Sequence, residues 1–237
     1  MTQQMIKAAA WAVCAMCPAL VAAPARAAQV ALPAGCEAFV TVQQRQCLVT
    51  HHYTCQGDPE GHQWRVDLTD EGMVYVAQID NQAQWIYSLD LFSGREERLV
   101  TPAADPASMD DLLAGEIDTW DFQTASADGE STRFFGYDLT SGTTQIDGVD
   151  LLITEAEITA ESASGETLWS AKGSQYVSTD WRMFLFGVDT YTNADGESWA
   201  IDHTPVDFIF PGEPGFLTDD PSYDCDVVMS SFDGGSQ

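Results

Sequence analysis

Basic side chains are scarce in this sequence. Nine Lys and Arg residues stand against 37 Asp and Glu residues, so the formal net charge is −28 at pH 7. Nucleic acids and anionic membrane surfaces attract proteins through positive surface charge. The sequence therefore argues against a nucleic-acid partner and against binding to an anionic membrane. We interpret the acidity as an adaptation for solubility in a salty exterior.

Short catalytic motifs are missing as well. The sequence contains no G-x-S-x-G, no H-E-x-x-H, no Walker-type phosphate loop and no G-x-G-x-x-G. Serine hydrolases, zinc proteases and nucleotide enzymes that carry such motifs lose their usual support. The sequence thus leans away from an enzyme, and we assign no catalytic residue, cofactor or metal ligand.

A long hydrophobic run occurs only at the N-terminus. Residues 8–23 form an apolar stretch, and Ala25-Arg26-Ala27 matches the A-x-A site of signal peptidase. The run is shorter than the ~20 apolar residues that a membrane span requires. We predict a signal peptide over residues 1–27, cleavage near Ala27, a periplasmic or secreted location and no membrane span in the mature chain. Cleavage removes Lys7 and Arg26 and no acidic residue, which leaves a net charge of −30.

Four cysteines remain after this cleavage: Cys36, Cys47, Cys55 and Cys225. An even number in an exported chain predicts two disulfides. Cys47 and Cys55 fall on one predicted strand, where strand rise separates them by ~26 Å, beyond the reach of a disulfide. We favour the pairs Cys36–Cys47 and Cys55–Cys225 over the crossed alternative.

Alternating apolar residues and glycine turns repeat along the mature chain. In the clearest case, residues 181–188 and 198–204 flank Asn193-Ala194-Asp195-Gly196, where glycine supplies the positive φ of a hairpin loop. The first predicted hairpin joins residues 46–55 to residues 62–68, and the last strand begins near Pro205. About ten to twelve strands predict a mainly β fold, an antiparallel meander that forms a curved sheet, barrel or half-barrel.

One short helix interrupts the strands within residues 101–115. Asp105 is the predicted N-cap, Pro106 takes the first helical position and Gly115 ends the helix. Its apolar residues are spaced to lie against a sheet or across the mouth of a barrel. We assign residues 28–229 to a single β-rich domain and residues 230–237 to a disordered tail. Lipocalin-like and lipoprotein-carrier half-barrels are the nearest architectural analogues, an analogy that establishes no function.

Aromatic side chains recur at alternate positions of successive strands. A curved sheet that encloses an apolar ligand would use them as its lining, and core packing alone would use them too. The function we predict is an exported, non-catalytic binding or carrier module for an apolar or amphipathic ligand. The predicted ligand-binding residues are Trp85, Tyr87, Trp120, Phe122, Phe135, Tyr137, Trp199 and Phe208. Trp169 belongs to the same aromatic series.

Two other functions fit the sequence. An envelope structural or interaction protein would use the Phe/Pro loop at residues 206–217, which predicts an exposed apolar patch there. A hydrolase would use His51 with Asp67, and His203 is a further candidate, which predicts three side chains within about 4 Å of one another in a cleft.

The second half of the chain carries a resemblance. The segments are Phe134-Phe135-Gly136-Tyr137-Asp138, Trp181-Arg182-Met183-Phe184, the run from Phe210 to Phe216, and Tyr223-Asp224-Cys225. With these, about half of the chain resembles uncharacterised secreted proteins of alphaproteobacteria. The resemblance is consistent with export and implies no activity.

Overall fold

The computed structural model of the chain describes residues 29–225. The predicted signal peptide and the predicted tail at residues 230–237 lie outside the described residues. Among residues 29–225, no helix is long and apolar enough to cross a membrane.

The described chain is almost entirely β-structure. Its first six strands are β1 (Cys36–Gln44), β2 (Leu48–Cys55), β3 (Gln63–Thr69), β4 (Gly72–Ile79), β5 (Trp85–Asp90) and β6 (Glu96–Leu99). After the helix α1 (Met109–Leu113) come β7 (Asp118–Ser126), β8 (Ser131–Ile146), β9 (Val149–Ser162), β10 (Thr167–Ser178), β11 (Met183–Asn193), β12 (Ser198–Asp202) and β13 (Pro205–Ile209).

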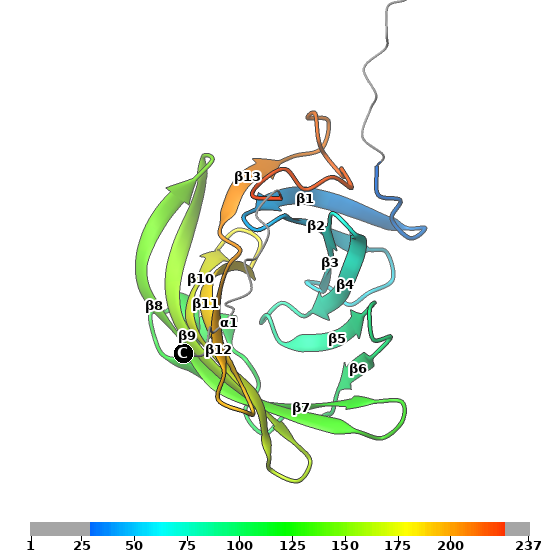
Figure 1. Cartoon of the computed structure of the whole chain (residues 1–237). Coiled ribbons are helices and arrows are strands. Elements are labelled where there is room, and N and C mark those ends of the chain that lie inside the picture. Colours follow the sequence, from blue (N-terminus) through cyan, green and yellow to red (C-terminus); the bar gives the residue numbers. More distant parts are fainter. Residues whose placement is uncertain (1–28, 226–237) are drawn as a thin grey trace, which may run out of the picture.

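All thirteen strands belong to one antiparallel sheet, in the order β12-β11-β10-β9-β8-β7-β6-β5-β4-β3-β2-β1-β13. Each strand from β1 to β12 lies beside its sequence neighbours, and β13 returns to pair with β1. The sheet curls around a central space, and only His203 and Thr204 separate its two edge strands, β12 and β13, along the chain (Figure 1). It is not closed into a barrel. The predicted antiparallel meander with one short helix is confirmed.

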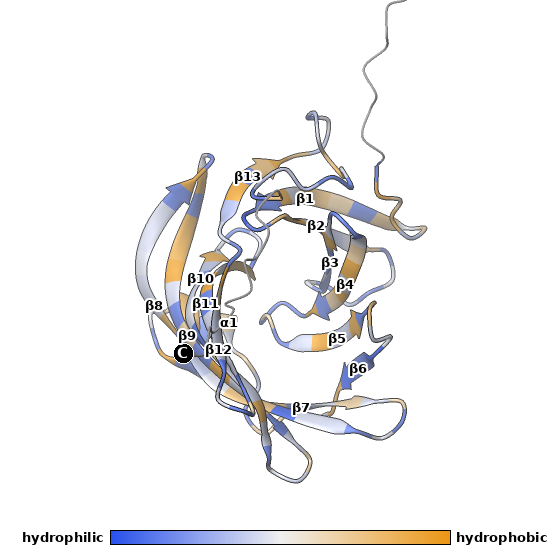
Figure 2. Cartoon of the chain, in the orientation of Figure 1, coloured by the Kyte–Doolittle hydropathy of each residue, from blue (hydrophilic) through white to orange (hydrophobic). Residues whose placement is uncertain are grey.

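Alternation of side chains sets which face each strand buries. In β7, Asp118, Trp120, Phe122 and Thr124 are buried, while the residues between them are exposed or half-buried. Apolar and polar bands alternate in the same way along the long strands β8 and β9 (Figure 2). Successive side chains point to opposite faces of a strand, so one face meets the enclosed space and the other meets solvent.

The long hairpin β8–β9 contains two glycines, Gly142 and Gly148, at which the sequence alone would allow a turn. The structure continues β8 through Gly142 with a β-bulge between Thr140 and Gly142, and the chain reverses only at Asp147 and Gly148, whose φ angles are 47° and 80°. A glycine at a bulge is therefore compatible with a continuous strand.

Strand β1 was missed by the sequence analysis, and the favoured disulfide pairing was wrong for that reason. β1 pairs antiparallel with β2 and places Cys36 directly opposite Cys55. The disulfides are Cys36–Cys55, with Cα atoms 3.9 Å apart, and Cys47–Cys225, at 4.4 Å. All four predicted cysteines are thus bonded, in the crossed pairing. Cys47 lies in the β1–β2 turn, at φ 59°, and not within a strand.

The helix is shorter than predicted and has a different cap. Ser108 is the N-cap, and its side chain accepts a hydrogen bond from the backbone N–H of Asp111 at 3.2 Å. Asp105 instead forms a backbone bridge with Asp121. Met109 and Leu112 are buried against Ala83, from the β4–β5 turn, and Val177, from β10. Because β4–β5 and β10 are far apart in the sheet order, the helix connects two separate parts of the sheet through its buried side chains.

Candidate functional site

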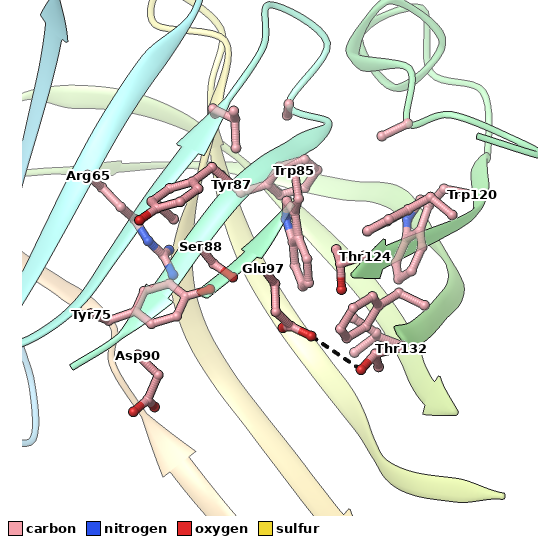
Figure 3. Close-up of a pocket in the computed structure, with 18 of the residues that line it drawn as sticks. Arg65, Tyr75, Trp85, Tyr87, Ser88, Asp90, Glu97, Trp120, Thr124 and Thr132 are labelled. Carbon is pink, nitrogen blue, oxygen red and sulfur yellow. Dashed lines mark hydrogen bonds between the residues drawn. The ribbon is translucent and has the colours of Figure 1, made fainter. Parts of the chain in front are cut away.

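The curled sheet encloses a cavity of about 1050 Å³. The cavity is lined from β2 round to β11, so nearly the whole sheet contributes to it. Its volume lies at the upper end of the roughly 300–1,000 Å³ typical of small-molecule pockets. Figure 3 shows aromatic rings and several polar side chains meeting around this space.

A continuous aromatic wall forms one side of the cavity. The ring of Trp85 lies edge-on to Phe122 at 5.5 Å and to Phe134 at 5.2 Å between ring centroids. Phe134 continues to Trp169 at 6.1 Å, and Trp169 to Tyr191 at 5.8 Å. These five rings come from β5, β7, β8, β10 and β11, and they line the cavity. Such distances are favourable for aromatic pairs, so the wall is a preformed apolar surface.

Four of the eight predicted ligand-binding residues line the cavity: Trp85, Tyr87, Trp120 and Phe122. Tyr87 borders it with its ring turned to Trp64, at 5.5 Å between centroids, and Arg98 lies over that ring at 4.6 Å. A β-bulge between Gln78 and Ile79 opposite this part of β5 shifts the alternation, which separates Trp85 from Tyr87. Of these four residues, Trp85, Trp120 and Phe122 therefore place their rings on the inner face of the sheet.

Phe135 and Tyr137 do not line the cavity. The pairing of Phe122 with Phe134 and of Trp120 with Gly136 puts the even-numbered residues of β8 on the inner face. Phe135 lies on the outer face, with the Arg133 guanidinium over its ring at 4.7 Å. The sequence analysis chose the odd-numbered positions because Phe135, Tyr137 and Leu139 are the more regular apolar series. The even-numbered residues include Gly136 and Asp138, so by sequence they resemble the solvent-exposed face of a strand.

The other two predicted residues lie elsewhere. Trp199 is on the edge strand β12, is 42% exposed, and stacks on Tyr191 at 6.0 Å. Phe208 is buried in a separate core cluster beside Trp181, at 5.9 Å between ring centroids. Sequence reasoning missed Phe134 as a lining residue, while Trp169 had been noticed in the aromatic series without being assigned to the site.

Buried carboxyl groups add polarity to the cavity. Asp138 lines it and accepts a hydrogen bond from Trp120 Nε1 at 2.9 Å. Burial raises the pKa of Asp138 to about 7, with a smaller contribution from the negative charges of Asp118 and Asp189. Burial likewise raises the pKa of Asp189 to about 6. These groups hold protons at pH values where exposed carboxyls have lost them.

A second polar cluster lies on the inner face of β6 and β8. Glu97 is ion-paired with Arg95 at 3.0 Å, and Thr132 donates a hydrogen bond to Glu97 at 3.4 Å (Figure 3). Arg95 also pairs with Glu130 at 2.7 Å. Each charge in this cluster has a partner within the protein, although Glu97 and Glu130 share the single guanidinium of Arg95.

The predicted hydrolase residues do not form a site. Asp67 is opposite Thr50 and accepts its hydrogen bond at 3.0 Å, whereas His51 is opposite Val66. His51 and Asp67 therefore lie on opposite faces of the sheet. His51 forms a hydrogen bond with Thr41 at 2.9 Å on the outer face, and burial lowers its pKa to about 4. The sequence analysis paired the right strands, but with a register that is wrong by one residue, which moves His51 to the other face.

The Phe/Pro loop is mostly packed. Phe208 is 3% exposed, and Phe216 packs against the cluster around Val49, Tyr53 and Val66 on the outer face. Only Phe210, at 36%, is exposed among the three phenylalanines of residues 206–217. The extended apolar patch expected for an interaction protein is therefore reduced to one side chain.

Among residues 29–225, no three His, Cys, Asp or Glu side chains lie close enough together to hold a metal ion. Comparison of the chain with protein-family models, with curated proteins and with solved structures finds no match. The resemblance to secreted proteins of alphaproteobacteria stays a prediction.

Proposed function

We propose that this chain is an exported, non-catalytic binding or carrier module that holds an apolar or amphipathic molecule inside its curled sheet. The observation that carries the proposal is the cavity of about 1050 Å³, in which the rings of Trp85, Trp169 and Tyr191 are only partly buried. Protein interiors are close-packed, so a role in core packing alone would bury these rings fully. Rings that stay partly exposed in a concave space instead suit a ligand.

Export is part of the proposal. The two disulfides suit an oxidising compartment, and the strongly acidic composition suits a soluble protein outside the cell. The predicted signal peptide would deliver the chain there.

The test is binding of N-phenyl-1-naphthylamine, an uncharged apolar fluorophore, to the full mature chain. We expect saturable binding with one site per chain. Ala156 lines the cavity from β9, so Ala156→Trp should fill part of it and weaken binding about tenfold or more. The neighbouring Glu155 is exposed on the opposite face of the same strand, and Glu155→Trp should leave binding unchanged. No binding to the wild type, or equal binding by Ala156→Trp, would overturn the proposal.

A further inference from the structure

The Arg65 guanidinium has no hydrogen-bond acceptor. Arg65 lines the cavity from β3 with 27% of its side chain exposed, and its Nε is buried without a hydrogen-bond partner. Its nearest carboxylate oxygen is Oδ2 of Asp67, 3.4 Å from Nε. Its guanidinium carbon lies 4.4 Å from the ring centroid of Phe186 and 5.3 Å from that of Tyr75. Among residues 29–225, neither these rings nor Asp67 accepts a hydrogen bond from it.

This state is costly for the folded protein. A guanidinium presents five N–H donors in a planar fork, and a donor withdrawn from water without an acceptor costs free energy. The stacked rings fix the plane of the fork and contribute cation–π attraction, but they supply no acceptor oxygen. The geometry therefore leaves donors for a molecule that enters the cavity.

The other charged groups in the cavity do not need such a molecule. Asp138 accepts from Trp120 Nε1, Asp90 accepts from Ser93 at 2.7 Å, and Glu97 is bound by Arg95. A cationic ligand would therefore have to compete with internal donors at each carboxylate. For an anionic ligand, Arg65 offers hydrogen-bond donors for which only Asp67 competes.

Asp67 is a weak competitor for Arg65. Its carboxyl is 4% exposed and already accepts a hydrogen bond from Thr50 at 3.0 Å. Burial raises the pKa of Asp67 above its ordinary value although Arg65 acts to lower it. Its Oδ2 lies 3.4 Å from Arg65 Nε without accepting a hydrogen bond, so Asp67 does not satisfy the guanidinium.

We propose that the ligand is an amphipathic monoanion, whose carboxylate is bound by Arg65 and whose apolar tail lies along the partly exposed rings of Trp85, Trp169 and Tyr191. This inference rests on the proposed function. A carboxylate matches the fork of a guanidinium with two parallel hydrogen bonds. A single negative charge is favoured over the two of a phosphate monoester, because Asp90, Glu97 and Glu130 line the same cavity in a chain of net charge −28.

The experiment measures displacement of N-phenyl-1-naphthylamine from the mature chain at pH 7.5 by decanoate, decan-1-ol and decyl phosphate. The wild type should bind decanoate about tenfold or more tightly than decan-1-ol. Arg65→Gln should abolish this preference, and Arg65→Lys should retain part of it, since the charge stays and the fork is lost. Asp67→Asn removes the competing carboxylate and should raise the preference several-fold. The exposed Arg45 in the β1–β2 turn does not line the cavity and supplies the control Arg45→Gln, which should change nothing.

The outcomes separate the two proposals. If the fluorophore and decan-1-ol bind and decanoate shows no advantage, the anion site is wrong and the binding function stands. If neither binds, both proposals fail. Tighter binding of decyl phosphate than of decanoate overturns the monoanion assignment. Should Arg65→Gln not fold, an unchanged preference in both Arg65→Lys and Asp67→Asn would still refute the role of Arg65.

Discussion

Replacing Asp138 by Asn should stabilise the protein at pH 8 and leave its stability nearly unchanged at pH 4. Asp138 is buried in the cavity wall, where its only hydrogen-bond donor among the described residues is Trp120 Nε1. Burial is the main cause that raises its pKa from 3.8 to about 7. An amide has nearly the same shape, keeps an acceptor oxygen for Trp120 and carries no titratable proton.

The size and sign of the effect follow from the pKa. Between pH 4 and pH 7 the folded protein keeps the proton that the unfolded chain has already released, so the free energy of unfolding falls as the pH rises through this window. The difference between a pKa of 3.8 and one of about 7 corresponds to about 4 kcal/mol. Asn escapes this penalty, so Asp138→Asn should gain up to about 4 kcal/mol at pH 8 and close to none at pH 4.

Urea unfolding followed by circular dichroism at pH 4, 6 and 8 measures this difference, with disulfides intact. The matched control is Asp121→Asn on the outer face of the same hairpin, where hydrogen bonds from Arg133 lower the pKa of Asp121. Its stabilising charge is lost as the pH falls, so this variant should lose stability at pH 8 and little at low pH. If Asp138→Asn changes stability equally at pH 4 and pH 8, the carboxyl does not hold a buried proton and the reasoning is refuted.

Two further predictions concern the stability of the sheet around the cavity. The Cys47–Cys225 disulfide closes a span of 178 residues, and its removal should destabilise the protein by about 5 kcal/mol. Removal of Cys36–Cys55, with its span of 19 residues, should destabilise it by about 3 kcal/mol. Urea unfolding of the two Cys→Ser double variants measures both values, and the reverse order would contradict the chain-entropy argument. Gly136→Ala should destabilise by at least about 1–3 kcal/mol, because a Cβ there would lie 1.9 Å from the Glu157 carbonyl oxygen and 2.9 Å from the Trp120 ring. Gly142→Ala is its control, with no atom nearer than 3.9 Å, and equal thermal shifts in both variants would show that close strand packing is not the cause.

Much of the fold could be predicted because its signals are local. The turn at residues 193–196 closes on Gly196, at φ 82°, and joins the strands that alternation had identified. Strand β1 could not be found in this way, because Thr41, Gln43 and Gln44 are buried polar residues in it. Their partners are distant: Gln43 bonds Asp220 and Ser222, more than 170 residues further along the chain. A burial that depends on such partners leaves no local pattern in the sequence.

The candidate site could be predicted only in part, for a related reason. The series from Trp120 to Phe122 is regular, and its inward direction holds. In β5, however, a bulge determines which residues face inward, and in β8 the register with β7 does so. Neither feature can be recognised from the residues of the strand alone. Arg65 carries no sequence signal at all. A single arginine between polar and apolar neighbours is typical of any solvated strand, and only the curl of the sheet turns it inward.

The size of the cavity bears on whether its aromatic wall serves packing or binding. At about 24 cal/mol per Å³, a dry void of 1050 Å³ would cost about 25 kcal/mol. That exceeds the roughly 5–15 kcal/mol by which folded domains are stable, so the space must hold water or a ligand. Water against the partly exposed rings of Trp85, Trp169 and Tyr191 is unfavourable, since removing apolar surface from water lowers the free energy. A molecule that covers these rings and accepts hydrogen bonds from Arg65 would remove both costs at once, which is why the two features favour one amphipathic ligand.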